Sequence, residues 1–201
     1  MVLKLPGGAS APGPAPAPAP SGPVGKVDMP LSADQIAAAM GAPAANVRKY
    51  WPAISQALAE SGITDRQSVI AVLATIAVET GRFEPIPEYA SGWAYEGRRD
   101  LGNVHAGDGP RYKGRGFIQI TGRANYRTYG NLLGVPLESN PDLALDAGIA
   151  AKIMASYFKQ RNIPAKARAG DWQGVRRAVN GGLNGYDRFY SVVRQLQAAA
   201  G

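Results

Sequence analysis

Residues 112–126 read Tyr-Lys-Gly-Arg-Gly-Phe-Ile-Gln-Ile-Thr-Gly-Arg-Ala-Asn-Tyr, and they join an irregular region of the chain to a helical one. Within this stretch Gln119 and Thr121 alternate with isoleucines, which is the pattern of a half-buried extended segment. Thr121 is also placed to cap a helix that we predict over residues 123–133. The stretch therefore predicts an extended segment that leads directly into a helix.

Helical periodicity dominates the chain from residue 33 to residue 80 and again after residue 122. Residues 66–80 are almost entirely apolar, which predicts a central buried helix. Residues 81–121 are instead rich in Gly, Pro and aromatic residues, and irregular segments of this length in a compact domain are usually functional. We expect an all-α fold with one long irregular loop region. The predicted helices cover residues 33–40, 45–61, 66–80, 123–133, 141–161, 172–179 and 186–199.

The composition limits the possible chemistry. The 201 residues suit one domain, and they include no Cys and a single His, His105. Disulfides and cysteine nucleophiles are excluded, and histidine-based metal sites and serine triads are disfavoured. We therefore expect no metal and no cofactor, with the chemistry carried by carboxylates. The net charge of +7 predicts attraction to polyanions, which include nucleic acid, anionic lipid and anionic cell wall.

Residues 1–28 differ from the rest of the chain in composition. Their alternating Pro, Ala and Gly cannot bury a core and favour extended conformers. We expect a disordered Pro/Ala-rich arm or linker over residues 1–28, or a processing remnant, followed by one folded domain over residues 29–201. No apolar run is long enough to span a membrane, and the start of the chain lacks the apolar core of a signal peptide. We expect no membrane insertion.

Glu79 is the first candidate for a catalytic role. It ends the apolar helix, where burial and the partial negative charge of the helix C-terminus both disfavour a carboxylate. A carboxyl group with a raised pKa can donate a proton as a general acid. From its position alone, an ordinary exposed glutamate at a helix end is the simpler interpretation.

The neighbouring motifs change this balance. Glu79-Thr-Gly-Arg-Phe is followed by Glu88-Tyr-Ala-Ser, by Tyr95-Glu-Gly-Arg-Arg-Asp-Leu-Gly-Asn103, by residues 112–126 and by Val179-Asn-Gly-Gly-Leu-Asn-Gly185. In this order, the chain resembles glycoside hydrolase family 19, which includes plant-type chitinases and related bacterial and phage cell-wall lysins. The resemblance covers roughly residues 35–199, and the Gly-Arg-Gly-Phe-Ile-Gln-Ile-Thr segment is its most specific part.

The resemblance implies a lysozyme-like, bilobal helical fold in which the loop region lines a carbohydrate cleft, inversion at the anomeric carbon and no cofactor. Glu79 matches the family's general acid, and Thr121 matches the Ser or Thr that helps to hold the attacking water. Tyr95 is a candidate for stacking on sugar, although loop aromatics more often pack locally. The positions that match residues lining the cleft, supporting the carboxylates or contacting sugar are Gln119, Asn125, Asn180 and Arg188.

The second carboxylate, which acts as the base, has two candidates. Glu88 follows Glu79 at a spacing that resembles the phage lysin branch, and Glu96 follows at the longer spacing of plant chitinases. Two prolines before Glu88 stiffen its approach, which helps to fix a carboxylate across a cleft. We prefer Glu88 and keep Glu96 as the alternative.

The function expected from these residues is that of a peptidoglycan hydrolase, an endolysin that cleaves β-1,4 bonds between amino sugars. A chitinase is the enzymatic alternative, and an inactive cell-wall-binding module is the alternative of another class. The net charge alone favours nucleic acid, but no nucleic-acid signature is present, so we expect none. We expect a monomer, made as a phage lysin in the host cytoplasm or carried in the virion, that acts on the cell wall.

Overall fold

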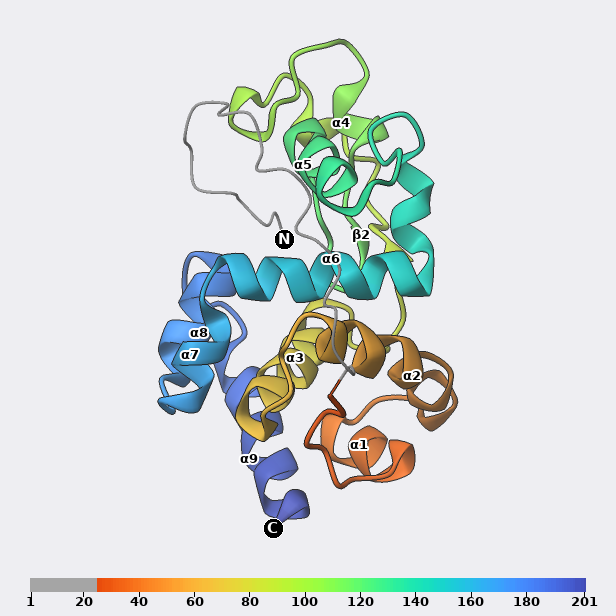
Figure 1. Ribbon diagram of the computed structural model, residues 1–201. Coiled ribbons are helices and arrows are strands. Elements are labelled where there is room, and N and C mark those ends of the chain that lie inside the picture. The colour runs from red at the N-terminus through yellow and green to blue at the C-terminus, as the bar shows by residue number, and fades with distance from the viewer. Residues whose placement is uncertain (1–24) are drawn as a thin grey trace.

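The computed structural model describes residues 25–201, which fold into two lobes on either side of helix α6 (Ala147–Gln160) (Figure 1). The first lobe contains α1 (Ala33–Met40), α2 (Ala44–Glu60), α3 (Arg66–Glu79), α7 (Ile163–Arg168), α8 (Trp172–Asn180) and α9 (Tyr186–Ala200). The second contains the short turns η1 (Trp93–Tyr95), η2 (Arg99–Leu101) and η3 (Pro141–Leu145), the helices α4 (Asp108–Arg111) and α5 (Arg123–Leu133), and the strands β1 (Ile86–Pro87) and β2 (Arg115–Gly116). The predicted all-α class is confirmed.

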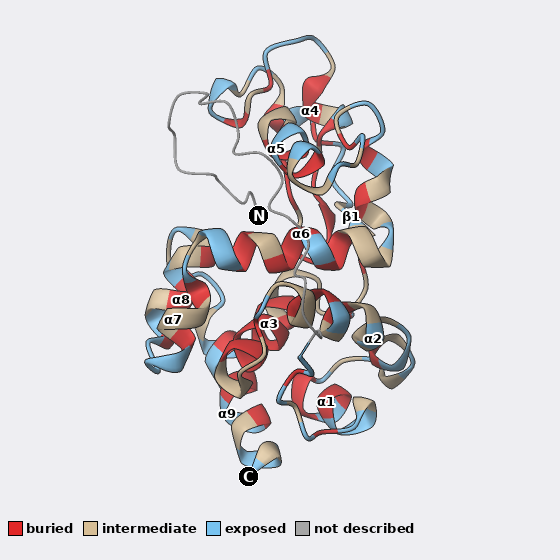
Figure 2. Ribbon diagram, in the orientation of Figure 1, coloured by how far each residue is buried: buried red, intermediate tan, exposed pale blue. Residues whose placement is uncertain are grey.

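Helix α3 is the centre of the first lobe, as its apolar sequence predicts. Every residue from Ser68 to Ala77 is buried, and α1, α7, α8 and α9 pack around it (Figure 2). Thr75 satisfies its hydroxyl group inside the helix by donating to the carbonyl of Ala71 at 2.8 Å. The helix begins at Arg66 because the Asp65 side chain accepts a hydrogen bond from the Ser68 amide at 2.9 Å.

The single helix predicted over residues 141–161 is wrong. The structure divides it into η3 and α6 at Asp146, whose backbone is extended and whose side chain accepts from the Ile149 amide at 2.9 Å. Asp146 thus acts as a helix cap rather than as a helical residue. Helix α7, which begins with an Ile-Pro pair, was not predicted either; proline is well tolerated in the first turn of a helix.

The N-terminal boundary of the folded part lies before residue 29. Most of the expected arm, residues 1–24, is outside the described residues. Val27 belongs to the hydrophobic core, and the Asp28 amide donates to the Thr64 carbonyl at 2.7 Å. Asp28 also forms an ion pair with Arg66 at 3.2 Å. Residues 27 and 28 therefore belong to the folded domain and not to the arm.

Within residues 25–201, no helix is both long and apolar enough to cross a membrane. The same residues contain no group of three or more His, Cys, Asp or Glu side chains placed to hold a metal ion.

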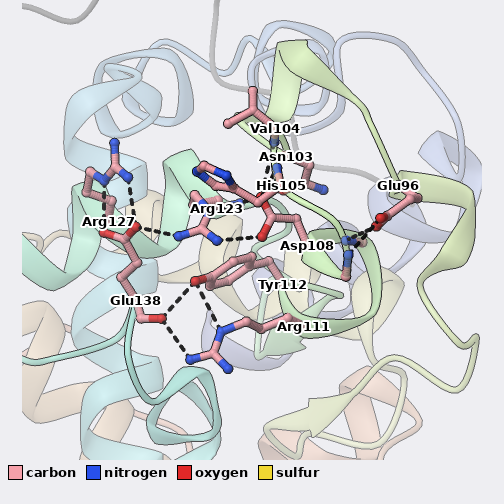
Figure 3. A network of polar contacts seen from close by, with 12 residues as sticks. Glu96, Asn103, Val104, His105, Asp108, Arg111, Tyr112, Arg123, Arg127 and Glu138 are labelled. Carbon is pink, nitrogen blue, oxygen red and sulfur yellow. Dashed lines mark hydrogen bonds and ion pairs between the residues drawn. The ribbon is translucent and has the colours of Figure 1, made fainter.

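A polar network holds the second lobe together (Figure 3). The buried Asp108 carboxylate accepts from the amides of Val104 and His105 and pairs with Arg123 at 2.5 Å. Arg123 also reaches Glu138 at 2.9 Å. The Arg123 guanidinium, together with these amides, holds the pKa of Asp108 below its ordinary range. A long loop with little regular secondary structure is therefore ordered in part by charged hydrogen bonds.

We expect Asp108→Asn to destabilise the domain by about 3–5 kcal/mol at neutral pH, because it leaves the Arg123 charge without its closest partner. Since the pKa of Asp108 is lowered on folding, its contribution is present above the ordinary carboxyl range and is lost as the pH falls through the folded value. Denaturant unfolding at pH 7 and in acid measures both effects. Asp187→Asn, at an exposed site on α9, is the control and should cost at most about 1 kcal/mol.

Candidate active site

Glu79 lies at the C-terminal end of α3 with its side chain only 2% exposed. Its Oε1 atom accepts a hydrogen bond at 2.9 Å from Nη1 of Arg176, whose side chain is completely buried. The simpler interpretation of Glu79 as an exposed helix-end residue is therefore wrong. A buried carboxyl group at the end of the central helix is paired instead with a buried guanidinium from α8.

The Arg176 side chain is fixed by the loop that follows α8. Its Nε atom donates to the carbonyl of Asn184 at 2.7 Å, and Nδ2 of Asn180 donates to the same carbonyl at 3.1 Å. Glu79, Arg176, Asn180 and Asn184 form what we call the Glu79 cluster. The structure thus places Asn180, a predicted site residue, beside the partner of Glu79.

Burial raises the pKa of Glu79 above its ordinary value, although the hydrogen bond and the charge of Arg176 act in the opposite direction. The desolvation of the carboxylate therefore outweighs the attraction of the guanidinium. A carboxyl group in this state can hold a proton above the pH at which an exposed glutamate would lose it.

Glu88 is positioned by the small sheet of the second lobe. Strands β1 and β2 pair Pro87 with Arg115, and just beyond this pair the Glu88 amide donates to the Gly114 carbonyl at 2.8 Å. The Gly114 amide donates in return to Oε2 of Glu88 at 3.1 Å, and the Tyr95 hydroxyl donates to Oε1 at 2.6 Å. Both carboxylate oxygens of Glu88 therefore have a fixed donor.

Gln119 completes this group, which we call the Glu88 cluster: Glu88, Tyr95, Gly114 and Gln119. A Cβ atom on Gly114 would lie 2.9 Å from Oε1 of Gln119 and 3.4 Å from Oε2 of Glu88, so glycine permits this close approach. Gln119 has a φ of 56° and donates to the Ile86 carbonyl at 2.7 Å. Left-handed backbone at a residue other than glycine costs free energy and is typical of functional sites.

Thr121 and Asn125 extend the Glu88 cluster toward α5. The Thr121 hydroxyl, which is completely buried, donates to the Gln119 carbonyl at 3.0 Å, and Nδ2 of Asn125 donates to the Thr121 carbonyl at 2.7 Å. The N-cap residue of α5 is Gly122, and no side chain caps the helix. The interpretation of Thr121 as a helix cap is therefore wrong, and its role as a water-holding residue stays a prediction.

The alternative base, Glu96, has a different role in the structure. Its two oxygens accept hydrogen bonds from the amides of Gly107 and Gly109 at 2.7 and 2.8 Å (Figure 3). These bonds tie together the two ends of the loop that precedes α4. The arrangement favours a structural function for Glu96 and supports our preference for Glu88 as the second carboxylate.

Arg188 lies apart from both clusters. Its guanidinium donates to the carbonyls of Ala77 at 3.2 Å and Met40 at 3.3 Å, and so links α9 to the C-terminal ends of α3 and α1. The arginine that contacts Glu79 is Arg176, which the sequence analysis missed. The available signal was its helical register: Arg176 shares the buried face of α8 with Trp172 and Val179, where a charged residue requires a partner.

The loop aromatics divide into two kinds. Tyr95 is only 8% exposed and packs within the lobe, whereas Tyr89 and Trp93 are 88% and 61% exposed. All three belong to the segment that carries Glu88. The two exposed rings are available to stack on a ligand, and the buried one is not.

The comparisons with known proteins agree with this fold. No family model matches this chain. A "glycosyl hydrolase family 19 domain-containing protein" of Haemophilus influenzae is 35% identical over 115 residues, which cover 57% of this chain and 56% of that protein. Over this stretch the chain is similar to a family 19 glycosyl hydrolase. An endochitinase of Arabidopsis thaliana is 31% identical over 127 residues, which cover 63% of this chain and 44% of the plant protein.

The chain spans about half the length of the curated proteins that it matches. Among solved structures, a variant of chitinase C has a TM-score of 0.65 at 20% identity, covering 84% of this chain and 92% of that one. A bacterial family 19 chitinase has a TM-score of 0.63 at 21% identity, covering 84% and 94%. The expected lysozyme-like helical fold is thereby confirmed.

We expect Glu79→Gln to be at least as stable as the original chain at pH 8. Because the folded chain binds the Glu79 proton more tightly than the unfolded chain does, this group favours folding in acid, and that contribution is lost as the pH rises through the raised pKa. The neutral amide keeps an acceptor for Arg176 and removes this loss. Thermal unfolding from about pH 4 to pH 8 should show the two proteins diverging as the pH rises.

Glu138→Gln is the matched control for this measurement. Hydrogen bonds from Arg127 and Arg123 lower the pKa of Glu138 to about 2, so its sign is opposite and the amide should lose stability at neutral pH. A loss of stability in Glu79→Gln that matches the loss in Glu138→Gln would contradict the raised pKa of Glu79.

Proposed function

We propose that this protein hydrolyses β-1,4 glycosidic bonds between amino sugars with inversion at the anomeric carbon. The observation that carries the proposal is the buried Glu79 carboxyl group. Burial raises its pKa, and a hydrogen bond from Arg176 fixes its position. Glycoside hydrolysis by inversion needs one such acid and one ionised carboxylate that activates water. The relatives of the chain are named as family 19 glycosyl hydrolases and chitinases, which supports the same chemistry.

In the proposed reaction, Glu79 donates its proton to the glycosidic oxygen as the bond to the anomeric carbon breaks. Glu88 accepts a proton from a water molecule whose oxygen attacks that carbon from the opposite face. Hydrogen bonds from the Tyr95 hydroxyl and the Gly114 amide hold the two carboxylate oxygens of Glu88 in place. Gln119 and Thr121, which are joined by a hydrogen bond and follow strand β2, are proposed to help position the water.

We propose peptidoglycan as the substrate polymer. The net charge of +7 favours encounter with an anionic wall and gives no advantage on neutral chitin. The absence of cysteines gives no indication of a disulfide-stabilised secreted chitinase. Chitin is the second candidate, because several relatives are named as chitinases.

Glutamine substitutions at Glu79, Glu88 and Glu96 should have different effects on activity and stability. We expect Glu79→Gln and Glu88→Gln to reduce turnover by about 100-fold or more while the folded state persists, because each loses a proton-transfer step. Glu96→Gln should instead lower the unfolding midpoint, because an amide offers one oxygen where two backbone donors now bind a carboxylate. Initial rates and denaturant unfolding are measured on the same preparations. Full activity in Glu88→Gln together with an inactive, stable Glu96→Gln would reverse the assignment of the base.

The substrate is tested by comparing initial rates on purified peptidoglycan and on soluble chitin oligomers at low and moderate ionic strength. We expect faster cleavage of peptidoglycan, with a rate on intact walls that falls as salt is added, because exposed charges are screened over roughly 10 Å at 0.1 M. Equal or faster cleavage of chitin would favour the chitinase alternative. Sedimentation with walls without release of any fragment would identify a binding module.

A further inference from the structure

Tyr95 departs from what its place in an aromatic loop predicts. A tyrosine that stacks on a sugar presents a ring face to solvent, but Tyr95 is 8% exposed and its hydroxyl group points at Oε1 of Glu88, 2.6 Å away. The exposed rings of the same segment are Tyr89 and Trp93. The geometry of Tyr95 therefore fits a partner of the carboxylate better than a platform for sugar.

The backbone of Tyr95 is fixed independently of Glu88. Its carbonyl accepts from Nδ2 of the completely buried Asn103 at 2.9 Å, and its amide donates to the Gly92 carbonyl at 2.9 Å. The following residue, Glu96, binds two backbone amides across the loop. The loop thus fixes the backbone of Tyr95, so the phenol group can restrain the Glu88 carboxylate and does not simply move with it.

The two donors to Glu88 act on different oxygens. The Gly114 amide binds Oε2 and the Tyr95 hydroxyl binds Oε1, so removal of either one leaves the carboxylate free to rotate about its last bond. Burial and the neighbouring Glu88 charge raise the pKa of Tyr95 to about 12, so the phenol keeps its proton and remains a donor at neutral pH.

We propose that Tyr95 is a positioning residue that orients the carboxylate of Glu88, and not a sugar-binding residue. The proposal rests on the proposed function for its catalytic consequence, because the oriented carboxylate is the base. Its structural half, a coupling between Tyr95 and Glu88, does not depend on any activity. The two parts can therefore be tested separately.

The first test compares the kinetics of Tyr95→Phe with those of Tyr112→Phe. Tyr112 is another buried tyrosine of the same lobe, and its hydroxyl donates to the Glu138 carbonyl. For Tyr95→Phe we expect kcat to fall by about 10- to 100-fold, as a misplaced catalytic group predicts, with KM changed by less than about twofold. Tyr112→Phe should keep both values. A raised KM with an unchanged kcat in Tyr95→Phe would overturn the proposal in favour of sugar binding.

The second test is a double-mutant cycle in denaturant unfolding with Tyr95→Phe, Glu88→Ala and the two combined. We expect the shifts of the unfolding midpoint to be non-additive, because the two residues share one hydrogen bond. Additive shifts would overturn the proposal. If the original chain hydrolyses neither polymer, the proposed function fails, but this cycle still decides whether Tyr95 orients Glu88.

Discussion

The hydrogen bond between Glu79 and Arg176 is the interaction on which the first lobe depends. At 2.9 Å it joins the end of the central helix to α8, and the guanidinium would be costly to bury without such an acceptor. Helix α8 must therefore pack in one register against α3, and the loop after α8 must offer its Asn184 carbonyl to Nε of the same guanidinium. The same pair that fixes the packing also fixes the position of the candidate acid.

The second lobe solves a different problem, because much of it is a long loop with little regular secondary structure. Carboxylates supplement the buried apolar side chains there: Asp108 binds two amides and Arg123, and Glu96 binds two further amides. These bonds satisfy backbone groups that regular secondary structure would otherwise pair. A loop ordered in this way can hold Tyr95 and Glu88 in place, since the Glu96 and Asp108 carboxylates bind its backbone amides.

The sequence predicted those features that depend on local periodicity and local chemistry. The apolar run of α3 and the helix over residues 123–133 are of this kind, and the structure confirms them. It could not predict contacts that tertiary packing decides. Arg176 and Arg188 both stand near the C-terminal motif, and only the packing of α8 and α9 determines which one reaches Glu79. Tyr95 was grouped with aromatics that stack, because nothing in its neighbours reveals the direction of its hydroxyl group.

Of the two donors that hold Glu88, one is a main-chain amide and the other a side chain. Point substitutions at residue 114 retain that amide unless they introduce proline, although any side chain there meets Gln119. The hydrogen bond from the residue 114 amide therefore survives most mutations, whereas the hydrogen bond from residue 95 depends on which side chain stands there. In directed evolution, substitutions at residue 95 can accordingly change the mobility of the Glu88 carboxylate while the Gly114 amide still binds it.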